Sequence, residues 1–281
     1  FINRELSWLQ FNRRVLAEAA NRDNPALERL KYLSITASNL DEFFMVRFAA
    51  LAARAQAGDE AEDPAGLSPR AQVDRIIEDA RLFVREQTAV LAEHVLPALS
   101  AVGLPLRTYP ETTPAQKRWA ERCFKRDILP KLSLKVHTES QSPKRTQRVA
   151  GRLLYLALLL LGEKKEDSLL ATVQVPAELS RAYRIPKALG DGFLLIEEII
   201  AAFAGQLAPN RRVLGCWPFR VTRDADFTVS GDVKGDLLVV ETKRSVRKRK
   251  TGDVVRLEIA ASAPEEVTDR LCALLPLKTG A

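Results

Sequence analysis

The sequence predicts an α+β multidomain protein, in which an N-terminal antiparallel helical bundle is followed by an α+β domain. Apolar residues recur at helical spacing through nearly all of the first hundred positions, whereas many later apolar stretches are short and bounded by Gly, Pro or charged turns. With 281 residues, 46% of them hydrophobic, the chain is long enough for two ordinary cores. We place the boundary near Pro105, which gives predicted domains at residues 1–104 and 105–281.

Four helices with short connections are expected in the first domain, and such connections predict an antiparallel bundle. The first helix lies in "NRELSWLQFNRRVLAEAA". Its broad apolar face consists of Leu6, Leu9, Val15 and Leu16, with Trp8 and Phe11 beside them. The second helix begins at "DNPALERLKYLSI", where Asn24 is a good cap and Pro25 suits the first turn.

The third helix is expected from Leu40 to about Ala57. A loop rich in Gly, Pro and acidic residues follows at 58–70. The fourth and longest helix is expected from Ala71 to about Leu99.

The stretch "KYLSITASNLDEFF", residues 31–44, separates the second and third predicted helices. Asn39 followed by Glu42 matches a helix N-cap, since the asparagine side chain accepts from orphan backbone donors. Ser38 followed by Asp41 offers the same pattern one residue earlier. A second interpretation is that the Asn39 amide and the Tyr32 ring, about two helical turns apart, recognise a purine by hydrogen bonding and stacking.

The second domain mixes strands and helices without a regular βαβ rhythm, which is typical of the α+β class. Strands are expected in "RLLYLALLLLG", "LLATVQV", "GFLLIE", "RVLGCWPFRVT" and "DVVRLEIAA". Helices are expected at 114–129 and in "EEIIAAFAGQL" and "PEEVTDRLCALL". The longest apolar run, from Leu153, spans about ten residues, roughly half of what a membrane helix needs, and reads as a buried strand.

The formal net charge of +7 and the pI of about 9.4 indicate a polyanionic partner. Nucleic acid, nucleotide, inorganic phosphate polymer and acidic membrane surface all remain open. Basic runs lie in the loop at 137–148, at 210–212 and at 243–250, where the last extends a predicted helix. A solvated surface explains these runs as well, and no aromatic residues interleave with them to stack bases, which argues against nucleic acid.

The residues that usually carry catalysis are sparse. His94 lies on a helix without a second histidine nearby, and His137 is expected in a solvated polar loop, so neither predicts a metal or catalytic site. Gly-rich phosphate motifs are missing. Three widely spaced cysteines without a C-x-x-C pair suit a reducing compartment and no structural zinc. We therefore predict no catalytic and no metal-binding residue within this chain.

The segments "ELSWLQFNRRVLAEA", "NPALERLKYLSI" and "SNLDEFFMVRFA" resemble, in order and spacing, the N-terminal domain of bacterial polyphosphate kinase, the family that extends polyphosphate from ATP. The segments "FLLIEEII", "VLGCWPFRVTRDAD", "RKRKTGDVVRLEI" and "PEEVTDRLCALL" are similar to that family's head, or middle, domain. Residues 130–150 depart from the family pattern, which usually has a Pro- and His-rich stretch there. The resemblance otherwise covers nearly the whole chain.

The resemblance implies a reversible phosphotransferase. In the family, the γ-phosphate of ATP passes to a histidine and then to polyphosphate, with Mg²⁺ and Arg stabilising charge, and the histidine lies in C-terminal catalytic domains that this chain lacks. We therefore expect a portion of a longer enzyme, inactive alone, with Mg²⁺ and ATP bound mainly by the missing domains. The matching positions imply that Asn39 reaches the ATP and that Tyr32 helps to cover the adenine.

The resemblance further implies ATP or ADP and inorganic polyphosphate as ligands, and a homodimer or higher assembly through the head domain. It implies a cytoplasmic location, with peripheral association at the inner membrane left open. A first alternative is a non-catalytic regulatory or scaffold protein of the same descent that binds polyphosphate or the full enzyme. A second is a nucleic-acid-binding module that uses the basic runs.

Overall fold

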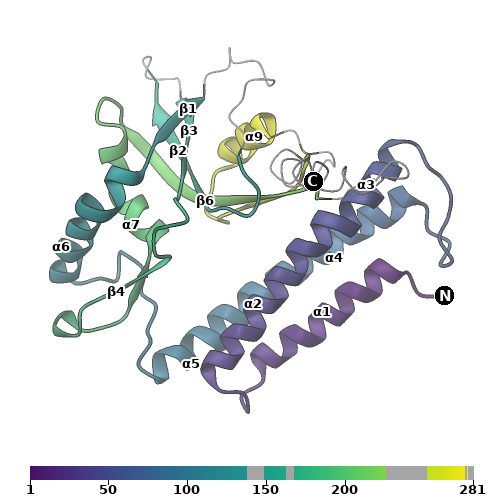
Figure 1. Ribbon diagram of the computed structural model, residues 1–281, viewed down its shortest axis with the longest axis horizontal. Coiled ribbons are helices and arrows are strands. Elements are labelled where there is room, and N and C mark those ends of the chain that lie inside the picture. Colours follow the sequence, from purple (N-terminus) through teal and green to yellow (C-terminus); the bar gives the residue numbers. More distant parts are fainter. Residues whose placement is uncertain (138–148, 163–167, 226–251, 276, 278–281) are drawn as a thin grey trace, which may run out of the picture. The chain divides into compact units, whose positions relative to one another are not determined.

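The computed structural model describes residues 1–137, 149–162, 168–225, 252–275 and 277 (Figure 1). The described residues form two compact units. The first contains Phe1–Val102 with the described residues of Thr222–Arg256 and Leu277, and the second contains the described residues of Gly103–Val221 and Leu257–Pro276. The predicted class, a helical N-terminal region followed by an α+β region, is confirmed.

Three long helical segments build the first unit, in place of the four helices expected from the sequence. They are α1 (Arg4–Ala20), then α2 (Ala26–Phe43) continuing through a π-helical turn (Phe44–Phe48) into α3 (Ala49–Gln56), and last α4 (Pro69–Val90) continuing through a second π-helical turn (Leu91–Val95) into α5 (Leu96–Ala101). Helix α1 packs against α2 and α4, and α3 packs against α4. Short connections make neighbouring segments antiparallel (Figure 1).

The expected break between residues 31 and 44 was wrong, because α2 runs without interruption through this stretch. Polar Thr36 continues the buried stripe of the helix: its hydroxyl donates to the Leu33 carbonyl oxygen at 2.7 Å and accepts from the Gln87 side chain at 2.8 Å. Satisfied in this way, it is fully buried. Neither Ser38 nor Asn39 therefore caps a helix.

A buried polar network joins α1, α2 and α4. The amide of Asn12, fully buried, donates to the Thr36 carbonyl oxygen at 3.0 Å and accepts from the Asn39 amide at 3.0 Å. Gln87 reaches the same Thr36 from α4. We call Asn12, Thr36, Asn39 and Gln87 the Asn12 network. Since each unpaired buried polar group costs about 1–3 kcal/mol, the network fixes how these helices pack.

The second unit is built on a five-stranded sheet with the order β1-β3-β2-β6-β7. The strands are β1 (Leu134–His137), β2 (Tyr155–Leu161), β3 (Ser168–Gln174), β6 (Val213–Arg223) and β7 (Val254–Ile259), and a separate pair joins β4 (Ala182–Arg184) to β5 (Phe193–Leu195). Strand β2 pairs antiparallel with both β3 and β6. The unit division cuts β6 and β7, so that residues 222–225 and 252–256 belong to the first unit.

Three α-helices accompany this sheet in the described residues: α6 (Pro114–Cys123), α7 (Ile196–Ala202) and α9 (Glu265–Leu274). Helix α6 begins with a capping box, in which Thr113 and Gln116 satisfy each other's backbone donors. Leu156, Leu158 and Val173 are fully buried in the core that α6 and α7 share with the sheet. Each fully buried side chain of this size contributes about 1.5–3 kcal/mol.

The five predicted strands are confirmed, including the buried strand from the longest apolar run. The sequence reading missed β1 and β4, which are short and largely exposed. His137 was wrongly expected in a solvated loop: it ends β1, half-buried, with Nε2 at 2.9 Å from the Thr172 hydroxyl. The rest of the loop at 138–148 and the basic run at 243–250 lie outside the described residues.

No helix in the described residues is long and apolar enough to cross a membrane.

Replacing Asn12 by Ala should destabilise the first unit by about 1–3 kcal/mol, because it removes one hydrogen bond to the Thr36 carbonyl and leaves the Asn39 amide without its partner. Urea denaturation followed by circular dichroism measures the change. Asn210→Ala, at an exposed position of the second unit, is the matched control. Equal stability of the two variants would contradict the role given to Asn12.

Candidate functional site

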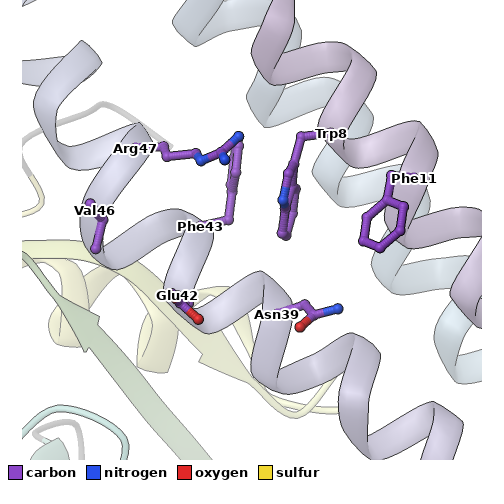
Figure 2. A pocket seen from close by; sticks show the side chains of 7 residues that line it. All are labelled: Trp8, Phe11, Asn39, Glu42, Phe43, Val46 and Arg47. Atoms are coloured by element: carbon purple, nitrogen blue, oxygen red, sulfur yellow. The ribbon is translucent and has the colours of Figure 1, made fainter.

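A pocket of about 200 Å³ opens between α1 and the C-terminal part of α2 (Figure 2). Its walls consist of Trp8, Phe11, Asn39, Glu42, Phe43, Val46 and Arg47. The α1 residues are spaced three apart, and Asn39, Phe43 and Val46 follow one another at steps of four and three, so each set lies on one helix face. The packing of α1 on α2 therefore brings two distant sequence segments together around one cavity.

One wall of the pocket is aromatic. The rings of Trp8 and Phe43 stack with centroids 4.7 Å apart and planes 13° from parallel. Phe11 stands beside Trp8 with 45% of its surface exposed, so part of its ring is open to solvent at the pocket. Flat aromatic faces at the edge of a cavity are well suited to stacking against a planar ligand.

Asn39 supplies the polar contact, and its orientation is fixed by Asn12. Because its Nδ2 donates to the buried Oδ1 of Asn12, its own Oδ1 is the acceptor left for a ligand, beside the second N–H of the amide. This oxygen has no hydrogen-bond partner among the residues that the structure describes. The pocket thus presents an acceptor beside an aromatic surface, which matches a planar ligand with an N–H donor on its edge.

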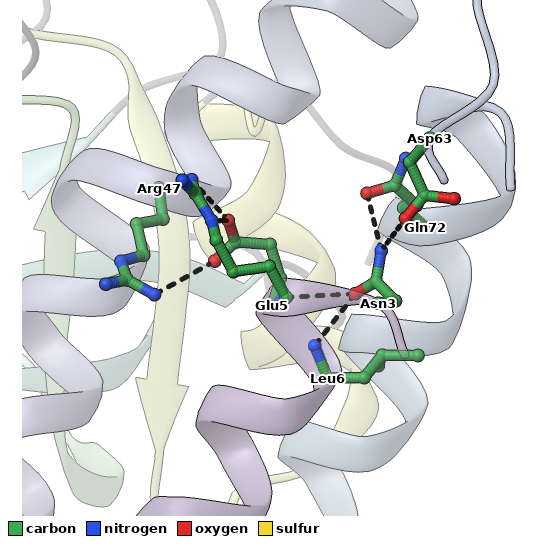
Figure 3. A network of polar contacts seen from close by, with 7 residues as sticks. Asn3, Glu5, Leu6, Arg47, Asp63 and Gln72 are labelled. Carbon is green, nitrogen blue, oxygen red and sulfur yellow. Dashed lines mark hydrogen bonds and ion pairs between the residues drawn. The ribbon is translucent and has the colours of Figure 1, made fainter. Parts of the chain in front are cut away.

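Arg47 supplies positive charge, and a second polar network holds it (Figure 3). Its guanidinium lies 5.7 Å from the centroid of the Trp8 ring and 3.4 Å from the carboxylate of Glu5. Asn3 caps α1 by accepting from the backbone N–H groups of Glu5 and Leu6. The cap therefore places Glu5 in the first turn, within reach of Arg47.

The same Asn3 side chain ties α1 to the segment before α4. Its amide donates to the Asp63 carboxylate at 2.7 Å and to the Gln72 side chain at 2.9 Å. Asp63 also accepts from the backbone N–H groups of Ala65 and Leu67. The hydrogen bond from Leu67, with further ones from Asn3 and Ala65, lowers the pKa of Asp63 below its ordinary value.

The π-helical turn after α2 is held from its other side by the ends of β6 and β7. The carbonyl oxygen of Met45 accepts from the Ala225 N–H at 2.9 Å. Arg256 lies 3.5 Å from the carboxylate of Asp41, both largely buried, and 5.1 Å from the centroid of the Phe44 ring. These contacts surround the turn that carries Val46 and Arg47.

Of the two residues predicted to contact a nucleotide, the structure places Asn39 in the pocket wall and Tyr32 outside it. Tyr32 lies seven residues before Asn39, about 10 Å along the helix axis. Sequence reasoning missed Trp8, Phe11 and Arg47. The i, i+3 pair of large aromatic residues in α1 was visible, but only the pairing of α1 with α2 shows that the pair faces Asn39.

The pocket does not suit Mg²⁺, which prefers six oxygen ligands, because Glu42 is the one carboxylate in its wall. No group of three His, Cys, Asp or Glu residues in the described ranges could hold a metal ion. Burial raises the pKa of the Cys216 thiol to about 12, and burial also raises the pKa of Cys123 and Cys272. Such thiols stay protonated and are poor nucleophiles.

Comparison with known proteins agrees with the resemblance seen in the sequence. Residues 1–107 match the family model of the polyphosphate kinase N-terminal domain, and residues 115–280 match that of the polyphosphate kinase middle domain. The polyphosphate kinase of Bacillus anthracis is 39% identical over 279 residues, which cover 97% of this chain and 39% of that protein. The polyphosphate kinase of Mycobacterium marinum is 37% identical over 289 residues, covering 100% of this chain and 38% of that protein.

The crystal structure of polyphosphate kinase from Porphyromonas gingivalis matches 99% of this chain and 38% of its own, with a TM-score of 0.77 and 27% identity. All three of these proteins are named polyphosphate kinases. The chain belongs to the polyphosphate kinase family and contains its N-terminal and middle domains. It spans about two fifths of the length of these relatives.

Asp63→Asn should lower the melting temperature near pH 7, and the difference from the parent chain should shrink as the pH falls below about 4. The pKa of Asp63 is lowered in the folded chain, so its ionised form stabilises the fold. That contribution is present above the ordinary value of 3.8 and is lost as the pH falls through the folded pKa. Thermal melts across this range, with the exposed Asp23→Asn as control, measure it. A difference that stays constant down to pH 3 would contradict the assignment.

Proposed function

We propose that this chain is the N-terminal and head portion of a polyphosphate kinase that reversibly transfers the γ-phosphate of ATP to polyphosphate through a phosphohistidine outside this chain. In this proposal the pocket between α1 and α2 receives the adenine end of the nucleotide. The observation that carries it is the Asn39 acceptor, oriented by Asn12, beside the exposed aromatic side chain of Phe11. The family membership supplies the reaction class.

The chemistry of the pocket favours adenine among the common bases. Adenine carries an exocyclic N6 amine, a donor, whereas guanine carries the O6 acceptor at the same position. The Oδ1 of Asn39 can accept from N6, but it would meet O6 as a second acceptor. One such hydrogen bond is worth about 0.5–1.5 kcal/mol in a partly exposed site, which is roughly a tenfold preference at most.

The role of this chain in the reaction is positioning. Phosphoryl transfer depends mainly on alignment and on stabilisation of charge, so holding the base end of ATP restricts where the γ-phosphate can lie. Mg²⁺ and the phosphorylated histidine belong, in this proposal, to parts outside the chain. The chain by itself is then inactive in polyphosphate synthesis.

Two further parts of the proposal rest on the family alone. Tyr32 is proposed to help cover the adenine, although it lies outside the pocket wall, and it is the weaker of the two assignments. A homodimer or higher assembly through the middle domain, in the cytoplasm, completes the proposal.

Asn39→Ala should raise the KM for ATP by about tenfold and change the KM for GTP little, because only the adenine amine uses the Asn39 oxygen. Polyphosphate synthesis by the natural protein that contains this chain, with Mg²⁺ and either nucleotide, measures both constants. GTP is an internal control, since a general loss of folded protein would affect both nucleotides alike. Asn210→Ala is the surface control.

If Asn39→Ala left the KM for ATP and the preference for ATP over GTP unchanged, the placement of adenine in the pocket between α1 and α2 would be overturned. Absence of polyphosphate synthesis by the natural protein would overturn the catalytic proposal and favour the regulatory or scaffold alternative.

A further inference from the structure

A second concave site lies in the second unit, on the face of the sheet opposite the core. We call it the sheet groove. It has a volume of about 240 Å³, and its walls consist of Lys131, Ser133, Lys135, Val149, Tyr155, Thr172, Gln174 and Pro176. This volume lies below the 300–1,000 Å³ usual for drug-sized ligands. It suits a small or linear ligand better than a whole nucleotide.

The strand register explains why polar side chains collect there. Lys135 of β1 pairs with Thr172 of β3, and Gln174 of β3 pairs with Tyr155 of β2. Alternate residues of a strand point to opposite faces, so Lys135, Thr172 and Gln174 share one face. Their immediate neighbours, such as Leu134 and Val173, point into the core. The sheet therefore has one apolar face and, at its β1 side, one polar face.

Two partly buried hydrogen bonds involve the Tyr155 hydroxyl and lead to the Gln174 amide. The backbone N–H of Ala150 donates to the Tyr155 hydroxyl at 3.0 Å, and the hydroxyl donates to the Gln174 Oε1, also at 3.0 Å. Tyr155 is only 5% exposed, so water does not compete readily for this bond. Since Oε1 accepts from Tyr155, the remaining hydrogen-bond donors of Gln174 are those of its amide nitrogen, and this exposed side chain lines the groove.

The remaining polar groups of the groove are also donors or carry positive charge. The ammonium groups of Lys131 and Lys135 have no hydrogen bond or ion pair among the described residues, and neither does the Ser133 hydroxyl. Lys131 is close enough to Asp127 to help lower the pKa of that carboxyl, but Asp127 is paired with Arg126. No carboxylate lines the groove among the residues that the structure describes.

We propose that the sheet groove binds an inorganic oligophosphate, with Lys131 and Lys135 neutralising charge and Ser133 and Gln174 donating to phosphate oxygens. Charge-assisted hydrogen bonds of this type are the strong ones. In the described part of the chain, the groove has no exposed aromatic ring on which a base could stack, which favours the bare phosphate chain over a nucleotide. The choice of oligophosphate among small polyanions rests on the proposed function, whereas the anion site itself does not.

A simpler explanation for Lys135 is protection of a sheet edge, because β1 is the outermost strand and charged residues there discourage pairing with another chain. That explanation predicts that any charge serves equally well. It does not account for the absence of carboxylates or for the orientation of Gln174. Replacement of lysine by glutamate separates the two, since the edge stays charged while the groove becomes repulsive to phosphate.

The test is calorimetric titration of this chain with inorganic tripolyphosphate in the absence of ATP. The double variant Lys131→Glu/Lys135→Glu should weaken binding at least tenfold. Lys187→Glu, an exposed lysine of the same unit, is the matched control and should change binding little. Circular dichroism and size-exclusion chromatography confirm that the variants stay folded and unaggregated. The proposed site would be overturned if the parent and the double variant bound tripolyphosphate equally well. It would also be overturned if Lys187→Glu lost as much affinity as the double variant.

The two histidines of the chain give a local readout by proton NMR. The ring of His137 lies 2.9 Å from the Thr172 hydroxyl at the groove, whereas His94 belongs to the first unit. At fixed pH, tripolyphosphate should shift the His137 ring signals and leave those of His94 in place. Shifts of neither, or of both alike, would contradict specific binding in the groove.

The outcomes also separate this site from the nucleotide pocket. Asn39→Ala should leave tripolyphosphate binding unchanged, because the mutation lies in the other unit. If Asn39→Ala does not change the KM for ATP but tripolyphosphate still binds in the groove, the proposal for the groove stands and the proposal for the nucleotide pocket falls. The choice of ligand would be overturned if a short RNA displaced tripolyphosphate and polyphosphate of greater chain length did not.

Discussion

The helical unit depends on one constraint, which is that the fully buried amide of Asn12 must be paired on both its donor and its acceptor side. Thr36 and Asn39 provide those partners from α2, and Gln87 reaches Thr36 from α4. This requirement sets the register of three helical segments at one point. It also ties one Asn39 N–H to Asn12 and leaves the Asn39 oxygen as an acceptor for a ligand. The pocket chemistry is therefore a consequence of how the core is satisfied.

In the second unit, too, the hydrogen bonds of a buried side chain determine which atoms of a neighbouring amide remain for a ligand. There a backbone N–H donates to the buried Tyr155 hydroxyl, and the hydroxyl donates in turn to the Gln174 Oε1, which leaves the amide nitrogen as the donor. One unit thus presents an acceptor beside aromatic rings, and the other presents donors beside lysines. Buried hydrogen bonds decide the polarity of both surfaces, since each buried donor or acceptor must first find its partner.

Much of the fold was predictable from the sequence because local patterns determine it. Strand β2 is a continuous apolar run, and the start of α4 was predicted to within two residues: the helix begins at Pro69, after the Ser68 cap, where the sequence analysis expected Ala71. The supposed break before Leu40 was wrong because Thr36 looks like an exposed residue but is buried with its hydroxyl satisfied by Gln87, distant in sequence. Strand β1 was missed because an exposed edge strand lacks a clear alternating pattern.

The site was only partly predictable. Asn39 was found through its family motif, whereas Trp8, Phe11 and Arg47 become site residues only when α1 packs against α2. No local pattern encodes that juxtaposition, nor the direction in which the Asn39 amide points. Tyr32, the other residue implied by the family resemblance, lies outside the pocket wall, and its contact with the adenine stays a prediction.

The most direct test of the central claim is a crystal structure of the natural protein that contains this chain, bound to a non-hydrolysable ATP analogue. The account predicts the adenine against Phe11 and Trp8, with its N6 amine about 3 Å from the Asn39 Oδ1 while the Asn39 amide still donates to Asn12. An adenine bound away from this pocket, or an Asn39 amide turned so that its nitrogen faces the ligand, would contradict it.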